Sequence, residues 1–322
     1  MIFQKIAQDT IRISDKAARF SGRVALRVIR SAADEAIPQV PIPPAGKAID
    51  LPGRGVTHVL DMPGPTPDAP VLMLMHGIAT TGALTWFSVL DELSEHYRVV
   101  SFDQRWHGRG IRSEKFSLDD CADDAAAVLD ALGIDKAFVA GYSMGGANAQ
   151  VMWRRHPERV AGLILCSTAS HWEGHLGERV FFRSLRVLNI GLLSIAANKV
   201  AHQGEKVIPA DEVAMDGLRQ WLLAELRTTS PWSIPVVMGE LSRFDSTKWI
   251  GGVDVPTGVL VTGKDHTIPT DRQRSLGAAI PGTIVRESPG GHTSLIFDVK
   301  NWKPLFLELV DDVVAQAYDE AA

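Results

Sequence analysis

The chain has 322 residues, of which 45% are hydrophobic and 22% charged, with a formal net charge of -5. This composition is typical of a globular protein and excludes a disordered or collagenous chain. Thirty-three basic side chains against 38 acidic ones give no excess of positive charge, which argues against nucleic acid as a partner.

Cysteine content and hydropathy narrow the class of protein further. Two cysteines, Cys121 and Cys166, are too few for a disulfide framework, and their spacing predicts no zinc site. We expect them to pack in a helix and a strand, in a cytoplasmic protein. The sequence contains no run of roughly 18 apolar residues that would predict a membrane-spanning helix. Its charged N-terminus lacks the apolar core of a secretory signal, so we interpret residue 1 as mature.

Residues 2–31 have the spacing of an amphipathic helix, with apolar side chains at steps of three, four or seven and mainly basic residues elsewhere. Such a helix can contact a membrane peripherally, pack on its own protein body, or pack on a second subunit in a homo-oligomer. We favour packing and keep the lipid alternative. Four prolines at 37–46 then predict a semi-rigid linker.

From about residue 56, short apolar runs alternate with helical patterns, which predicts an α/β fold with a mostly parallel central sheet flanked by helices. The expected strands lie at 57–62, 71–75, 98–102, 137–140, 160–166, 257–262 and 283–286. The expected helices lie at 118–132, 147–155, 271–279 and 302–317. Ser117 can cap the first of these helices and Gly133 can end it.

Almost ninety residues after Cys166 contain no convincing strand but show helical spacing at 179–197 and 211–227. We therefore expect a core at 51–168 and 247–322, a helical lid at 169–246, and an N-terminal helix and linker at 1–50. The lid's aromatic residues suit either a hydrophobic cleft or packing of the lid on the core, namely Trp172, Phe181, Phe182, Trp221 and Trp232.

A G-x-S-x-G element at residues 141–145 lies between an expected strand and an expected helix. Small residues around Ser143 allow a tight turn that exposes the hydroxyl at the edge of the sheet. Because a serine hydroxyl needs a base that a carboxylate orients, we expect both groups on later loops. Asp265 follows the expected strand 257–262, and His292 follows the strand at 283–286. The order Ser, Asp, His is the one described for this elbow.

With these motifs, the sequence from about Gly53 to the C-terminus resembles the α/β-hydrolase superfamily. The loop at His76-Gly77 is similar to the family's oxyanion loop, which implies oxyanion donation by the backbone amides of Ile78 and Met144. Residues 102–110 resemble the family's D-x-R-G-H-G-x-S segment, with Trp106 at a usual glycine and Gly110 at a usual serine. Those departures can alter a wall of the cleft.

The resemblance also matches Asp265 and His292 to the acid and base positions. In some relatives the acid follows an earlier strand, but residues 166–168 here contain no carboxylate, and Glu173 is a remote alternative. The other histidines have local or structural interpretations. His171 and His175 are spaced like metal ligands, but no third ligand follows, so we expect no metal. We expect substrate contacts from Ala79, Trp86, Tyr142 and Trp172.

The hypothesis is a carboxylesterase-like serine hydrolase acting on a hydrophobic ester, without a cofactor. Ser143 attacks the carbonyl, His292 takes the proton and Asp265 holds the imidazolium. An acyltransferase, thioesterase, lactonase or carbon-carbon bond hydrolase would use the same triad, and a non-catalytic binding protein on this fold is the rival from another class. Epoxide and haloalkane hydrolases fit less well, because such relatives carry aspartate at the Ser143 position.

Overall fold

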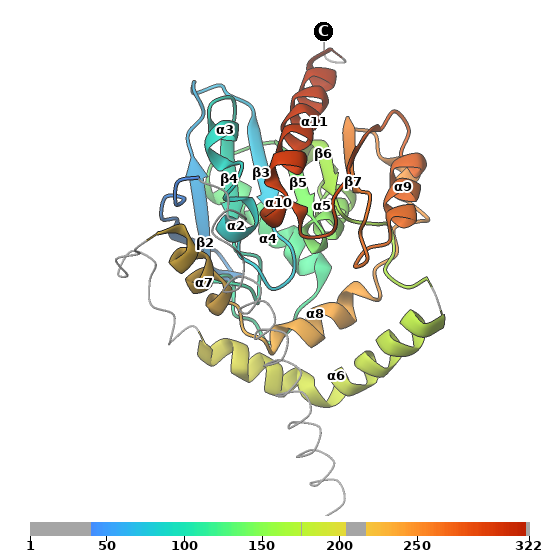
Figure 1. Ribbon diagram of the computed structural model, residues 1–322. Helices are drawn as coiled ribbons and strands as arrows, with labels where there is room; N and C mark the ends of the chain where they lie inside the picture. The colour runs from blue at the N-terminus through green and yellow to red at the C-terminus, as the bar shows by residue number, and fades with distance from the viewer. Residues whose placement is uncertain (1–39, 175, 204–216, 320–322) are drawn as a thin grey trace, which may run out of the picture.

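The computed structural model describes residues 40–174, 176–203 and 217–319, which contain an eight-stranded sheet (Figure 1). The strand order is β1-β2-β4-β3-β5-β6-β7-β8. Strands β3 to β8 pair in parallel, whereas β1 pairs with β2 and β2 with β4 in antiparallel register. The strands are β1 Lys47–Leu51, β2 Gly55–Met62, β3 Val71–Met75, β4 Arg98–Phe102, β5 Ala137–Tyr142, β6 Val160–Cys166, β7 Thr257–Thr262 and β8 Ile284–Ser288.

The predicted mostly parallel sheet is confirmed, and the strands expected at 71–75, 98–102, 160–166 and 257–262 have those bounds. The other three differ from their predicted bounds by one or two residues at one or both ends. Strand β1 was not predicted, because this edge strand exposes most of its side chains and buries only Leu51, so it has no apolar pattern. The sheet thus begins four residues before the boundary expected at residue 51.

Helices cover both faces of the sheet. Met73 and Met75 of β3 face a core cluster shared with α4, α5 and α9, while Leu72 and Leu74 face a second cluster shared with α3 and α11. Helix bounds are α2 Gly82–Trp86, α3 Leu90–Ser94, α4 Leu118–Ala131, α5 Met144–Arg155, α9 Thr270–Ala279, α10 Ser294–Phe297 and α11 Val299–Asp319.

The predicted ends of α4 are confirmed. The Ser117 hydroxyl accepts a hydrogen bond from the Asp120 amide at 3.0 Å, as an N-cap residue does. Gly133 follows the helix at φ +64°, a left-handed conformation that glycine adopts without strain. Both cysteines are fully buried and free.

Three helices are inserted between β6 and β7: α6 Leu176–Gln203, α7 Leu218–Thr228 and α8 Ser233–Leu241. Figure 1 shows α6 and α8 below the sheet, with α7 beside β2. The helical spacing at 179–197 lies within α6. Of the segment expected at 211–227, residues 218–227 lie within α7, and residues 211–216 lie outside the described residues. The predicted helix at 2–31 lies outside the described residues.

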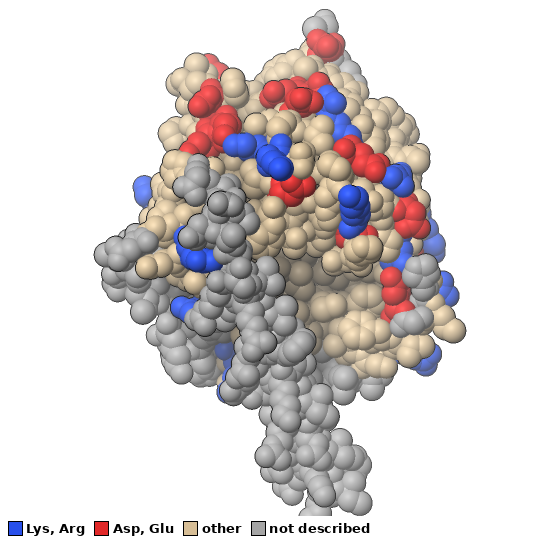
Figure 2. Space-filling view, in the orientation of Figure 1, with Lys and Arg blue, Asp and Glu red and all other residues tan. Residues whose placement is uncertain are grey.

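Charged side chains of both signs are scattered over the upper part of the face in Figure 2. Below them, near the middle of this face, the surface is hollowed and uncharged. Within the described ranges, no helix combines the length and the apolarity needed to cross a bilayer.

Candidate active site

Ser143 lies in the turn between β5 and α5 with φ 54° and ψ -115°. A residue with a side chain seldom adopts positive φ, and such strain persists only where the surroundings impose it. The Ser143 amide donates to the Cys166 carbonyl at 2.9 Å, and the Ser143 carbonyl accepts from the Thr168 hydroxyl at 2.9 Å. Both contacts tie the turn to the end of β6, so the neighbouring strand fixes the strained turn.

The glycines of the turn are needed for space. A Cβ atom on Gly145 would lie 2.1 Å from the Met75 carbonyl oxygen, and one on Gly141 would lie 2.3 Å from the Gly145 carbonyl oxygen. Side-chain carbon atoms do not approach backbone oxygens this closely. The close approach of α5 to β3 and β5 therefore depends on glycine.

The three residues predicted to act together lie in one hydrogen-bonded chain. His292 Nε2 is 3.0 Å from Ser143 Oγ, and His292 Nδ1 is 2.7 Å from Asp265 Oδ2. Because a carboxylate accepts, the proton of a neutral His292 belongs on Nδ1, which leaves the lone pair of Nε2 facing the serine hydroxyl. This arrangement suits removal of the hydroxyl proton.

Asp265 accepts hydrogen bonds on both carboxylate oxygens. Its Oδ1 receives the amides of Thr267 at 2.8 Å and Ile268 at 2.9 Å. Its Oδ2 receives the Thr262 hydroxyl at 2.7 Å and Gln273 Nε2 at 3.0 Å, besides His292. Burial raises the pKa of Asp265, but His292 and these donors outweigh it and hold that pKa below its usual value. Asp265 is therefore a carboxylate at neutral pH.

Gln273 was not predicted as a site residue. It is fully buried on α9, where its Nε2 also donates to the Ile268 carbonyl at 2.7 Å and its Oε1 accepts from the Thr262 amide at 2.9 Å. These bonds connect the end of β7 to the loop that carries Asp265. The feature of the sequence that could have identified Gln273 is its position on the buried face of a predicted helix, directly after the Asp265 loop.

The loop after β3 carries Ile78 beside Ser143. A Cβ atom on Gly77 would lie 3.7 Å from Ser143 Cβ, and Ala79 has φ 63°. Met144 is the first residue of α5, where an amide has no partner within the helix. Over the described part of the chain, no protein acceptor takes a hydrogen bond from the Ile78 or Met144 amide. Both amides are thus available to a ligand oxygen.

Buried polar groups support this loop from below. His76 Nε2 accepts from the Gln104 amide at 2.9 Å, so the ring proton lies on Nδ1, 2.7 Å from the Gly77 carbonyl oxygen. Gln104 Nε2 donates to the His76 carbonyl at 2.7 Å, and Asn148 Nδ2 donates to Gln104 Oε1. Burial lowers the pKa of His76 to about 4, against a smaller opposing effect of the Gly77 hydrogen bond. Sequence reasoning gave His76 only a conformational role and missed Gln104 and Asn148.

The residues expected to contact the substrate have different environments. Tyr142 packs its ring 5.6 Å from the His292 ring, and Ala79 lies in the loop beside Ser143.

Trp86 is fully buried against Trp302 and Phe306, which is the environment of a core residue. Trp172 packs edge-on against Phe244, at the border of the inserted helices.

The remaining candidate residues have other partners. Glu173, the alternative acid, pairs with Arg186 of α6, and His266 is exposed.

Trp106 has φ 65°, so it occupies a left-handed conformation at the position where the family that the sequence resembles has glycine. A Cβ on Gly110 would lie 2.4 Å from the Asp103 carbonyl oxygen, which explains why serine is absent there. In the described residues, no group of three or more His, Cys, Asp or Glu side chains could hold a metal ion.

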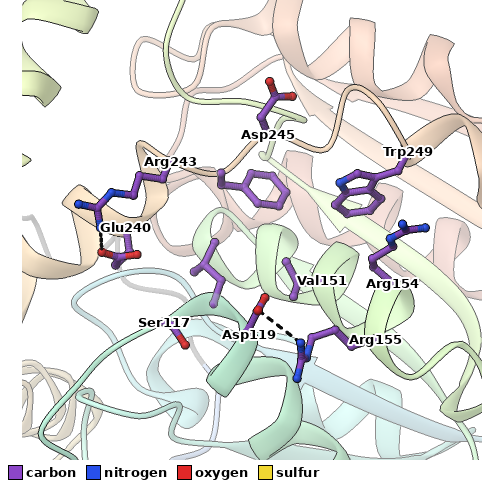
Figure 3. A pocket seen from close by; sticks show the side chains of 11 residues that line it. Ser117, Asp119, Val151, Arg154, Arg155, Glu240, Arg243, Asp245 and Trp249 are labelled. Carbon is purple, nitrogen blue, oxygen red and sulfur yellow. Dashed lines mark hydrogen bonds and ion pairs between the residues drawn. The ribbon is translucent and has the colours of Figure 1, made fainter.

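A separate cavity of about 750 Å³ lies between α8, α4 and α5 (Figure 3). Trp249 and Phe244 contribute apolar surface, and charged pairs such as Arg243 with Glu240 and Arg155 with Asp119 line its rim. None of the predicted site residues lines this cavity.

Comparison with known proteins places this geometry in context. The family model described as the alpha/beta hydrolase fold matches residues 70–299. A protein of Caulobacter vibrioides (strain NA1000 / CB15N) named "Putative carbamate hydrolase RutD" is 34% identical over 257 residues, which cover 77% of this chain and 93% of that protein.

Solved structures show the same fold. The enol-lactonase from Burkholderia xenovorans LB400 is similar with a TM-score of 0.64 at 21% identity, over 82% of this chain and 98% of that one. The esterase EaEST from Exiguobacterium antarcticum is similar with a TM-score of 0.64 at 19% identity, over 83% of this chain and 99% of that one.

Proposed function

Because the chain belongs to the α/β-hydrolase fold family and is a hydrolase, we propose that it cleaves a hydrophobic carboxylic ester through an acyl-enzyme intermediate. The observation that carries this proposal is the hydrogen-bonded chain from Ser143 through His292 to Asp265. It begins at a strained serine at the N-terminus of α5, beside the Ile78 and Met144 amides, for which the described residues provide no hydrogen-bond acceptor.

In the proposed reaction, Ser143 Oγ attacks the ester carbonyl while His292 Nε2 takes the hydroxyl proton. The tetrahedral oxyanion accepts hydrogen bonds from the Ile78 and Met144 amides, each typically worth about a hundred- to a thousandfold in rate. Collapse expels the alcohol, which receives the proton from His292. Water then attacks the acyl-enzyme with the same base, and Asp265 stabilises the imidazolium in both halves.

A hydrophobic substrate is supported by the inserted helices, which we propose act as a lid. Trp172, Phe182 and Phe244 belong to the apolar cluster on this side of the sheet, and the surface hollowed in Figure 2 is uncharged. An acyl chain would lose contact with water there, which favours its binding by roughly 25 cal/mol per Å² of buried apolar area.

A carbamate is the second candidate substrate, because the Caulobacter vibrioides relative is named for carbamate hydrolysis. A carbamate carbonyl would meet the same nucleophile and the same amides. Since the nitrogen lone pair makes that carbonyl less electrophilic, cleavage would depend more strongly on the two oxyanion donors.

The test compares turnover of nitrophenyl esters and carbamates of graded acyl length by the wild-type protein and by Ser143→Ala. A fluorophosphonate probe followed by intact mass reports whether Ser143 reacts. Ser275→Ala, which changes an exposed serine of α9, is the matched control.

We expect turnover and a single probe adduct in the wild type and in Ser275→Ala, and neither in Ser143→Ala. The preferred leaving group and acyl length would then assign the ester or the carbamate. Labelling without turnover would instead favour a transferase or a binding protein. Equal labelling of Ser143→Ala would overturn the assignment of the nucleophile.

A further inference from the structure

A buried carboxylate of the inserted helix α7 contacts both loops that border the candidate active site. Glu225 is 2% exposed, and its Oε2 accepts the Thr81 hydroxyl at 2.7 Å. Arg109 donates Nη2 to Oε1 at 2.7 Å and Nη1 to Oε2 at 3.2 Å. We call these three side chains the Glu225 cluster. Its members are 116 and 144 residues from Glu225 in the chain, so only the docking of α7 brings them together.

The Thr81 hydroxyl is engaged on both sides. It accepts the Leu84 amide at 3.0 Å as the N-cap of α2, so its proton is free to go to Glu225. Thr81 directly follows the loop that carries Gly77, Ile78 and Ala79. The carboxylate of Glu225 thus fixes the far end of the loop whose amide faces the proposed oxyanion.

The second loop is tied to the same point. Asp103 accepts the Gly82 amide on Oδ1 at 2.9 Å and the Arg109 amide on Oδ2 at 2.8 Å. At the end of α7, Thr229 Oγ1 accepts the Gly108 amide at 2.9 Å. Two carboxylates therefore cross-link the 77–82 and 103–110 loops to each other and to α7.

Apolar packing brings α7 to this position. Trp221 and Leu222 are buried against Leu84 of α2 and against Phe87, which directly follows α2, with the Trp221 and Phe87 rings 6.0 Å apart. Packing of this kind has no directional preference, whereas the Glu225 cluster requires one orientation. The apolar contact thus sets where α7 lies, and the ion pair between Glu225 and Arg109 sets the orientation of α7 at that place.

We propose that Glu225 is a positioning residue, through which α7 holds the 77–81 loop and the Ile78 amide in the geometry that the oxyanion needs. This inference rests on the proposed serine hydrolase. It makes the inserted segment a structural part of the oxyanion site as well as a cover for the cleft. Without the Glu225 carboxylate, the loop would lose its anchor at Thr81 while the Ser143, His292 and Asp265 contacts stay in place.

The test is Glu225→Gln, which keeps the side-chain shape, removes the charge and leaves one acceptor oxygen for the three hydrogen bonds that the carboxylate accepts from Thr81 and Arg109 on two oxygens. We expect kcat to fall about 10- to 100-fold with KM changed less than about threefold, because the lost contact acts on the transition state. Hydrogen exchange of the Gly82, Leu84 and Thr85 amides, which donate to Asp103 and Thr81, should become about tenfold faster, while exchange of the 262–268 amides stays unchanged. Glu240→Gln, in which a second inserted glutamate loses its Arg243 partner, is the matched control and should alter neither readout.

Thr81 supplies a second pair of variants in case Glu225→Gln folds poorly. Thr81→Val should reproduce both effects, and Thr81→Ser, which keeps the hydroxyl, should retain wild-type behaviour. Unchanged exchange at Gly82, Leu84 and Thr85, or unchanged kcat, in a Glu225→Gln protein that still labels at Ser143 would overturn the positioning role alone. A wild-type protein that neither turns over nor labels would overturn the serine hydrolase, and the oxyanion role of Glu225 with it.

Discussion

Two histidines below the oxyanion loop are fully buried with their rings 5.2 Å apart. Burial lowers the pKa of His76 to about 4, and burial together with the neighbouring His76 lowers the pKa of His107 to about 3. His107 Nδ1 lies 3.0 Å from the Arg105 carbonyl oxygen and therefore carries the proton. Both rings are consequently neutral in the folded protein across the physiological pH range.

The stability of the fold should therefore decrease on acidification. In the unfolded chain both imidazoles bind a proton below pH 6.5, whereas the folded chain does not until pH 3 to 4, so stability is full above pH 6.5 and is lost as the pH falls. At pH 5 each buried histidine should account for about 2 kcal/mol of this loss. Urea unfolding of wild type and His107→Phe at pH 7 and pH 5 measures it.

The variant His107→Phe should lose about 2 kcal/mol less than the wild type between these two pH values. His96→Phe, which changes an exposed imidazole, should keep the wild-type difference. Equal losses in wild type and His107→Phe would show that His107 takes up a proton in the folded state.

At the scale of elements, the junction of β5 and α5 depends on close backbone contact with β3. The missing side chain of Gly145 leaves room for the Met75 and His76 carbonyl oxygens, which would lie 2.1 and 2.8 Å from a Cβ atom. Those oxygens belong to the end of a central strand and to the start of the oxyanion loop. Neither can retreat without disturbing the sheet.

Gly145→Ala should therefore lower the free energy of unfolding by about 3 kcal/mol or more, since overpacking against backbone cannot be relieved by a rotamer change. Gly252→Ala is the control, because no atom of the described residues lies within 4 Å of its added Cβ. We expect the control to change stability by less than about 0.5 kcal/mol. Denaturant unfolding compares the two, and similar midpoints would show that α5 can shift away from β3.

At the scale of the whole molecule, one buried carboxylate joins three segments. Asp124 of α4 is 1% exposed and accepts Arg54 Nε at 2.5 Å from the β1–β2 turn. It also accepts Arg105 Nε at 2.6 Å and Nη2 at 2.8 Å from the segment after β4. The antiparallel edge of the sheet is thus tied to the helix layer and to the segment that borders the site.

Asp124→Ala should destabilise the fold by about 3–5 kcal/mol, because it leaves two arginine side chains without their buried acceptor. Asp123→Ala removes a more exposed partner of Arg155 and should have an effect of about 1 kcal/mol or less. Equal effects in equilibrium unfolding would mean that water replaces Asp124 without loss.

The sequence by itself determined the features whose causes are local. Strand lengths follow from runs of buried apolar residues, the start of α4 follows from Ser117, and the tight turn at Ser143 follows from the glycines beside it. The sequence also predicted that Ser143, Asp265 and His292 lie close together, because the loops that follow parallel strands all lie at the same edge of the sheet. The spacing of short apolar runs likewise predicted the sheet.

Only the tertiary structure decided which distant groups meet. Gln273 reaches Asp265 because α9 packs on β7, and Glu225 reaches Thr81 and Arg109 because α7 docks on α2. It also decided that Trp86 is a core residue and that the exposed edge strand β1 joins the sheet. The physical reason is that a polar side chain gains its partner only when packing of the apolar faces brings it close, and no nearby residue encodes that approach.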